Sequence, residues 1–213
     1  MLRSLRHSLL ALGLLSIAPT GSRAGGPAAV TSTTPAVIRL VGASGVTPDA
    51  TAGQFTVVAR DLANNPMNGC SIVLDLSNCP DLAICSDQMD ANALVNCAAK
   101  TVRKFTNALG QVTFTVLGSS TGAGSAASLA NGGRIFGNGR LLGMPSVSAF
   151  DLDGSGGVGA GDLSVWLSDF GSGVAYQRSD FDGSGTIGAA DLSAWLAVFG
   201  AGGSAQSCGA SCP

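Results

Sequence analysis

Glutamate is absent from this 213-residue sequence, and its one histidine is His7. Charged residues make up 11% of the composition, whereas soluble domains usually carry about 25%. Beyond the first few residues, therefore, the chain cannot build a Ser-His-Asp triad, a histidine-ligated zinc site or a pair of catalytic glutamates. The formal net charge of -2 gives no reason to expect binding to nucleic acid or to an anionic membrane.

Residues 1–24 have the features of a secretory signal peptide. Arg3 and Arg6 form a basic start, an apolar run follows at 9–18, and Ser22 and Ala24 are small residues at the positions that a signal peptidase requires. An uncleaved membrane anchor is the alternative, but a span needs about 20 apolar residues. We therefore expect cleavage after Ala24, a secreted or extracellular bacterial protein, and no transmembrane segment in the mature chain.

Six cysteines suit an oxidising compartment, where an even number usually forms disulfides. The disulfide candidates are Cys70, Cys79, Cys85, Cys97, Cys208 and Cys212. We prefer the pairs Cys79–Cys85, Cys70–Cys97 and Cys208–Cys212, although sequence alone does not choose among the pairings. A zinc site of four thiolates is the alternative, which the absence of tight Cys-x-x-Cys pairs disfavours.

A period of two residues runs through 35–144, after a small and polar stretch at 25–34 that we expect to be a flexible lead-in. Apolar residues alternate with polar ones at Val112, Phe114 and Val116, and turn residues at 107–110 separate two such runs. Short alternating runs between Gly, Asn and Pro turns predict an antiparallel β-sandwich.

Parts of this region resemble bacterial Ig-like repeats of the invasin and intimin type. The resemblance rests on Phe-Thr-Val-Val-Ala-Arg-Asp at 55–61, Asn-Pro at 65–66, Ser-Ile-Val-Leu at 71–74 and Thr-Asn-Ala-Leu-Gly-Gln-Val-Thr-Phe at 106–114. The cysteine-bearing loop at 79–97 is extra to that pattern. The resemblance implies an Ig-like fold over 35–144 that serves as a spacer or as an adhesive module for a carbohydrate or another surface ligand.

Residues 151–171 and 180–200 are two copies of one unit, offset by 29 residues. Each copy begins Asp-x-Asp-Gly-Ser-Gly and has another Asp at loop position 12. Oxygen-bearing residues at positions 1, 3, 5 and 12, with Gly at position 6, are the pattern of a Ca²⁺-binding loop. The predicted ligands of two Ca²⁺ ions are Asp151, Asp153, Ser155, Gly157 and Asp162, and then Asp180, Asp182, Ser184, Thr186 and Asp191. Gly157 and Thr186 would contribute backbone carbonyls.

A helical period follows each loop. Apolar residues recur at i, i+3, i+4 and i+7, and we expect all of them to be core residues. They are Leu163, Trp166, Leu167 and Phe170, and then Leu192, Trp195, Leu196 and Phe199. Gly171 and Gly200 are expected to cap the helices. Val158 and Ile187 are expected to pair the two loops through a short strand contact.

A loop with an exit helix, duplicated and closed by Asp at position 12, resembles a type I dockerin, which is EF-hand-like. The resemblance implies that 145–205 form a calcium module that docks onto a cohesin-like or other cell-surface protein. Dockerins often carry hydroxylated residues at loop positions 10 and 11, where this chain has Ala160-Gly161 and Ala189-Ala190. This departure affects the expectation of a cohesin partner, because these positions contact the cohesin, but it does not affect the predicted calcium ligands.

Together these patterns predict a mostly β protein with a small α module: an Ig-like antiparallel β-sandwich, a dockerin-like pair of calcium loops with helices, and a cysteine-containing tail at 206–213. We expect a secreted, non-catalytic calcium-binding protein used for docking or surface display. The alternative is an adhesive or structural protein in which calcium only stabilises the C-terminal module. An enzyme is disfavoured, because the Asp residues outside the loops show no catalytic motif.

Overall fold

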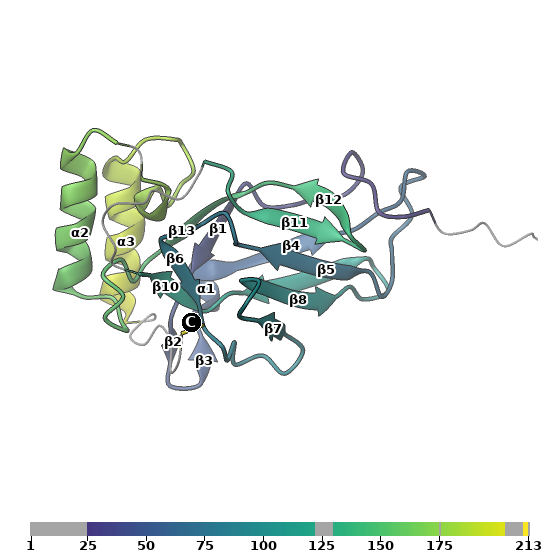
Figure 1. Ribbon diagram of the computed structural model, residues 1–213, viewed down its shortest axis with the longest axis horizontal. Helices are drawn as coiled ribbons and strands as arrows, with labels where there is room; N and C mark the ends of the chain where they lie inside the picture. Colours follow the sequence, from purple (N-terminus) through teal and green to yellow (C-terminus); the bar gives the residue numbers. More distant parts are fainter. Residues whose placement is uncertain (1–24, 122–129, 175, 203–210, 213) are drawn as a thin grey trace, which may run out of the picture.

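The chain forms a β-rich body with a small helical region against one end of it (Figure 1). The computed structural model describes residues 25–121, 130–174, 176–202 and 211–212. The strands are β1 Val37–Leu40, β2 Ala43–Ser44, β3 Thr47–Pro48, β4 Gln54–Val58, β5 Ser71–Asp75, β6 Leu82–Ile84, β7 Leu94–Asn96, β8 Thr101–Phe105, β9 Gln111–Thr115, β10 Gly118–Ser120, β11 Arg134–Gly137, β12 Arg140–Gly143 and β13 Ser146–Ala149. The helices are α1 Ala50–Gly53, α2 Ala160–Gly171, the 3₁₀ turn η1 Gln177–Ser179 and α3 Ala189–Ala201. The prediction of a mostly β protein with a small α module is confirmed.

The largest sheet has the order β12-β11-β5-β8-β7, and its neighbouring strands are antiparallel. In the central strand β5, Ile72 and Leu74 are fully buried, whereas Val73 and Asp75 on the other face are half-buried. Because successive side chains of a strand point to opposite faces, the two-residue period gives this sheet one apolar inner face.

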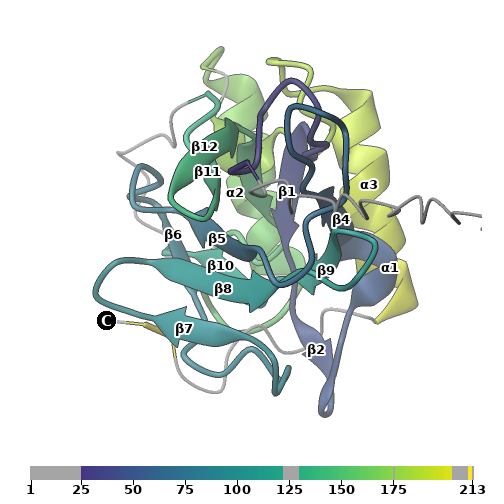
Figure 2. The same cartoon turned by 90° about the vertical axis from the view of Figure 1, so that its right-hand side faces the viewer.

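Smaller strand pairs cover that inner face. β4 pairs antiparallel with β9, and the rings of Phe55 and the buried Phe114 stack on the core-facing side of the pair, with 5.6 Å between centroids. The turn at 107–110 carries the chain from β8 in the large sheet to β9 opposite, with Gly110 at a φ of 72°. Figure 2 shows β5, β7 and β8 on one side and β1, β4 and β9 on the other, with the main core cluster drawn from both.

One strand pair departs from the antiparallel prediction. β1 pairs in parallel with β13, in a register that places Val37 opposite Ser146 and Leu40 opposite Ala149. Parallel pairing needs a long connection, and the rest of the β-rich body supplies it here. β13 lies within the range 145–205 that we assigned to the calcium module, so the strand leading into the first loop is also part of the β-rich body.

Residues 25–34 are held against the body, which differs from the flexible lead-in that their composition suggested. Thr33 and Val58 exchange two backbone hydrogen bonds of 2.8 and 2.9 Å, and the Ala28 N–H donates to the Arg60 carbonyl at 2.8 Å. Small polar side chains do not prevent a segment from pairing, because the hydrogen bonds come from the backbone. The segment thereby pairs with the C-terminal end of β4, at Val58.

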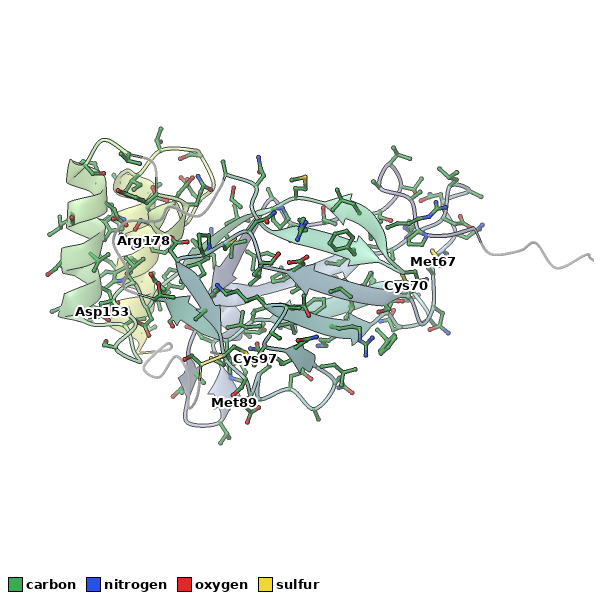
Figure 3. The ribbon with its side chains drawn as sticks, viewed as in Figure 1. Met67, Cys70, Met89, Cys97, Asp153 and Arg178 are labelled. Carbon is green, nitrogen blue, oxygen red and sulfur yellow. A yellow bond between two sulfur atoms is a disulfide. The ribbon has the colours of Figure 1, made fainter. Side chains whose placement is uncertain are left out.

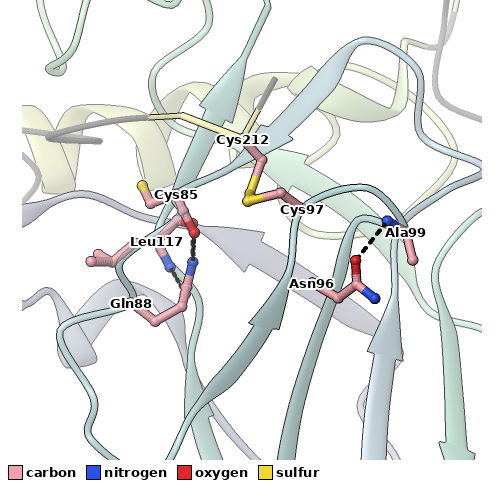
Figure 4. The surroundings of a disulfide bond; sticks show 7 residues. All are labelled: Cys85, Gln88, Asn96, Cys97, Ala99, Leu117 and Cys212. Atoms are coloured by element: carbon pink, nitrogen blue, oxygen red, sulfur yellow. Dashed lines mark hydrogen bonds between the residues drawn. A yellow bond between two sulfur atoms is a disulfide. The ribbon is translucent and has the colours of Figure 1, made fainter.

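The preferred disulfide pairings are wrong. Cys97 is bonded to Cys212, across a sequence separation of 115 (Figure 4). Cys70 and Cys79 are buried as thiols, and Cys85 is disulfide-bonded. Cys208 lies outside the described residues. The four-thiolate zinc site fails too, since Cys85 and Cys97 are both in disulfides.

The C-terminal tail explains this pairing. Ser211 forms an antiparallel bridge with Cys85, and the Cys212 N–H donates to the Ile84 carbonyl at 2.8 Å. The tail therefore returns to β6, which brings Cys212 beside Cys97. Such a long-range return is a tertiary contact that cysteine spacing does not encode.

Helices α2 and α3 pack on a second core cluster through Trp166 and Trp195, which are 3% and 1% exposed. The expectation that the whole apolar stripe is core is wrong for four of its members, which are about half exposed. These are Leu167 at 54%, Phe170 at 54%, Leu196 at 48% and Phe199 at 49%. Each helix contacts the rest of the protein on one side only, so it buries a narrower stripe of residues than a helix enclosed on several sides would. None of the helices in the described part of the chain could cross a membrane.

The glycines that we expected to cap the helices are helical residues instead. Gly171 is the last residue of α2 and Gly200 lies within α3, whereas Gly173, after α2, and Gly202, which caps α3, have left-handed backbone conformations. The described residues also contain no strand bridge between Val158 and Ile187, which are half-buried against the second core cluster.

Candidate metal centre

The two repeated loops bring their aspartates together as the sequence predicted. Asp151, Asp153 and Asp162 each offer a carboxylate oxygen, and these atoms lie within 4.8 Å of one another. A matching trio with the same limit comes from the second loop and consists of Asp180, Asp182 and Asp191. Figure 3 shows Asp153 at the helical side of the molecule, far from Met67 and Cys70 at the other end.

The first loop folds around its own carboxylates. Asp151 Oδ2 accepts the Gly156 N–H at 3.0 Å, and Asp153 Oδ1 accepts the Ser155 N–H at 2.8 Å. Gly154 and Gly156 take backbone φ values of 71° and 96°, which residues other than glycine rarely adopt. These turns direct the loop inward, so that its carboxylates converge.

Asp162, at position 12, connects the start of the first loop to its end. Its Oδ1 accepts the N–H groups of Leu152 at 2.6 Å and Asp153 at 3.0 Å, and its Oδ2 accepts the Gly159 N–H at 2.6 Å. The residue lies in the first turn of α2, where the exposed N–H groups and the helix dipole stabilise a negative charge.

The second loop repeats this arrangement. Asp180 accepts the N–H groups of Ser184 at 3.0 Å and Gly185 at 2.8 Å. Asp191, in the first turn of α3, accepts those of Asp182 at 3.1 Å and Gly188 at 2.8 Å. The sequence repeat is therefore also a repeat of hydrogen bonds.

The other predicted ligands have less direct geometry. In the second loop the Ser184 hydroxyl donates to the Thr186 carbonyl at 3.0 Å, so two of them already contact each other. In the first loop Ser155 is exposed, with its N–H donated to Asp153, and Gly157 is half-buried. The described contacts thus support the carboxylates most strongly.

Burial and hydrogen bonding act on these carboxyls in opposite directions. Burial raises the pKa of Asp162 to about 6 and also raises the pKa of Asp180. Burial would raise the pKa of Asp153 as well, but hydrogen bonds from Ser155 outweigh it and lower that pKa. The hydrogen bond from Ser184 lowers the pKa of Asp182. Each loop therefore combines a carboxyl that resists ionisation with one that favours it.

The donor chemistry fits a hard cation. Every predicted ligand offers oxygen, with neither histidine nor thiolate among them, and three carboxylates per loop would repel one another without a counter-charge. Glycines allow each loop to adjust around an ion of Ca²⁺ size. Asp151, Asp153 and Asp162 would hold one ion, and Asp180, Asp182 and Asp191 the other.

Sequence reasoning missed a buried ion pair beside the loops. Asp169 on α2 accepts hydrogen bonds from Arg178 Nε at 2.8 Å and Nη2 at 2.7 Å. The signal was present, since Asp169 is three residues after Trp166 on the buried face of α2. A carboxylate on such a face needs a partner. Arg178 lies in η1, so the pair fastens the connection between the two repeats to α2.

A second missed contact joins the loops to each other. Phe150 precedes the first loop and Phe181 is the second residue of the other loop. Both rings are buried, and they stack with centroids 4.7 Å apart. Because each ring is next to a loop aspartate, the stack ties the entrances of the two loops together.

Comparisons with protein-family models, curated proteins and solved structures found no match for this chain. The function is therefore argued from the geometry of the two loops and the surfaces around them.

Proposed function

We propose that the two loops each bind one Ca²⁺ ion and that the helical region is a dockerin-like docking or surface-display module on a secreted, non-catalytic protein. The observation that carries the proposal is the pair of carboxylate trios, each with ligand atoms within 4.8 Å of one another. Two closely similar arrangements of a hard-cation donor set favour a metal over an ordinary acidic turn. Calcium would offset the repulsion in each trio and stabilise the exit helices.

The exposed apolar residues of the helices support a docking role. Leu167 and Phe170 on α2 correspond in the repeat to Leu196 and Phe199 on α3, and all four are about half exposed. A contiguous exposed apolar patch marks an interaction surface, and we propose that these four residues form one. The partner in this proposal is a cohesin-like or other cell-surface protein. The small residues at loop positions 10 and 11 leave these apolar residues as the main source of contact.

A second candidate function is adhesion by the β-rich body, folded as an Ig-like sandwich, with calcium only stabilising the C-terminal region. The outer face of the five-stranded sheet favours it. A cavity of about 520 Å³ lies over β7 and β8, lined by residues that include Leu94 and Arg103. A carbohydrate or another surface ligand would occupy this cavity.

The calcium proposal is tested by calorimetric titration of residues 25–213 with calcium chloride. We expect two sites in the unsubstituted chain and one site in Asp162→Asn or Asp191→Asn. Arg103→Met, on the outer sheet face, is the matched control and should keep both sites. Absence of heat in the unsubstituted chain, with metal-free protein confirmed by elemental measurement, would contradict the proposal.

The two candidate functions are separated by retention of the labelled protein on bacterial cell-surface preparations. Docking predicts that chelation and the pair Leu167→Ser with Leu196→Ser both abolish retention, while Arg103→Met leaves it intact. Adhesion through the sheet predicts the reverse, namely that Arg103→Met weakens retention and the leucine variants keep it.

A further inference from the structure

Strand β1 contacts the second loop directly. Arg39 Nε donates a hydrogen bond to the Phe181 carbonyl oxygen at 2.6 Å. A Cβ at Gly183 would overlap the Val37 side chain, so the loop backbone lies closely against the strand. The contact joins residues 142 positions apart in the sequence. It therefore links the β-rich body to one of the two loops.

The peptide group that Arg39 holds also contacts a predicted metal ligand. The Phe181 carbonyl and the Asp182 N–H belong to one planar peptide unit. Its oxygen accepts from Arg39, and its N–H donates to Asp191 Oδ1 at 3.1 Å. A hydrogen-bond donor on one side of a peptide thus fixes the direction of the N–H on the other. Arg39 acts on the position-12 carboxylate through this single peptide.

We propose that Arg39 is a positioning residue for the second calcium site, which makes calcium binding by that loop depend on the β-rich body. The proposal rests on the calcium function proposed above and adds a residue outside the loop that sets the affinity of one of the sites. Groups that orient metal ligands without touching the ion typically change metal affinity about 10- to 100-fold when removed. Arg39 does not itself coordinate the ion.

The charge of Arg39 acts against this positioning effect. After the hydrogen bond from Ser184, which is the main cause, the Arg39 charge also contributes to the lowered pKa of Asp182. A cation so close to the carboxylates would repel Ca²⁺ by the same interaction. Positioning by Arg39 would raise the calcium affinity, whereas its charge would lower it. The change in affinity on replacing Arg39 therefore shows which effect is larger.

The first loop provides the internal comparison. There the Asp151 carbonyl accepts the backbone N–H of Ser120 at 2.7 Å, and the Leu152 N–H donates to Asp162. A backbone donor in β10 is unaffected by a change at Arg39. Loss of the Arg39 side chain should therefore weaken the second site and leave the first unchanged.

The test measures calcium affinity by calorimetry in residues 25–213, one loop at a time. Asp162→Asn leaves the second loop and Asp191→Asn leaves the first. Adding Arg39→Met should weaken calcium binding by about 10- to 100-fold in the Asp162→Asn chain and by less than about twofold in the Asp191→Asn chain. Arg39→Lys, which keeps a donor and the charge, should restore part of the lost affinity.

Unchanged or tighter binding by the second loop in Arg39→Met would overturn the positioning role, and so would equal weakening of both loops. Near-ultraviolet circular dichroism checks that the variant is folded, and Arg39→Gln replaces it if it is not. If the unsubstituted chain binds no calcium, the proposed function fails as well. Normal two-site binding with no effect at Arg39 overturns this inference alone.

Discussion

Asp169 and Arg178 form a two-pronged ion pair in which each side chain is only 3% exposed. The Ser179 hydroxyl donates a third hydrogen bond to Asp169, at 2.6 Å. The side-chain hydrogen bond with Asp169 is the main cause that raises the pKa of Arg178. The ring of Tyr176 lies 5.1 Å from the guanidinium, which places an aromatic face over the same cation.

Breaking this pair should destabilise the protein strongly. Asp169→Asn removes the carboxylate that accepts two hydrogen bonds from the buried Arg178, and breaking a buried pair in this way typically costs about 3–5 kcal/mol. Urea unfolding in the presence of calcium measures the change. The double variant Asp169→Leu with Arg178→Met should recover part of the stability, because an apolar pair needs no counter-charge, while the buried Asp81 loses the nearby Arg178 charge. A loss below about 1 kcal/mol in Asp169→Asn would contradict the prediction.

Removal of calcium should be visible in tryptophan fluorescence. The two tryptophans of the sequence, Trp166 and Trp195, are both buried on α2 and α3. Without a cation the carboxylates repel and the exit helices loosen, so we expect a red-shifted emission and less helical circular dichroism in EDTA. Calcium added back in excess should reverse both changes, whereas identical spectra in calcium and EDTA would contradict the coupling.

The metal-free protein should lose stability as the pH rises. Burial raises the pKa of Asp162 from 3.8 to about 6, so the folded state binds this proton more tightly than the unfolded state does. The stabilisation is complete below about pH 4 and disappears above about pH 6, a difference of up to about 3 kcal/mol. Asp180 acts with the same sign.

The measurement is urea unfolding of calcium-free protein at pH 5 and pH 7.5. Histidine does not interfere when residues 25–213 are used, because His7, the one histidine of the sequence, lies outside that range. Asp162→Asn should lose part of the pH dependence. Asp153 and Asp182 have lowered pKa values and act only at more acidic pH. Greater stability at pH 7.5 than at pH 5 would show that the sign is wrong.

Loss of the Cys97–Cys212 bond should also be costly. The bond closes a loop with a sequence separation of 115, and the chain-entropy model gives about 4–5 kcal/mol for loops of this size. Because Cys85 is also disulfide-bonded, the chain is already cross-linked, and we expect Cys97→Ser with Cys212→Ser to lower the free energy of unfolding by at most about this amount. Thermal and urea unfolding under non-reducing conditions measure the loss, and an unchanged midpoint would contradict it.

Local patterns predicted local structure well. The alternation at Val112, Phe114 and Val116 gave a strand with a buried face, and the repeated Asp spacing placed three carboxylates together in each loop. Both predictions depend on the spacing of residue types within a short stretch of the chain, which can be read directly from the sequence.

Features set by distant contacts were not predictable in the same way. The pairing of Cys97 with Cys212 depends on where the tail returns, and the parallel pairing of β1 with β13 joins segments more than 100 residues apart. The contact of Arg39 with the second loop is of the same kind, since it joins residues 142 positions apart. The buried position of Asp169 could have been inferred from its helix face, but its partner Arg178 could not.

The parallel pairing of β1 and β13 has a mechanical consequence. A pull between the N-terminal end of β1 and the helical region acts on opposite ends of the two strands. All four register pairs, from Val37 with Ser146 to Leu40 with Ala149, would then be loaded in shear together. Antiparallel strands pulled from a common end open instead one pair at a time. A protein that holds a partner by its helices could thus carry tension without unzipping, while the disulfide at Cys97 offers a second, covalent path for the same force.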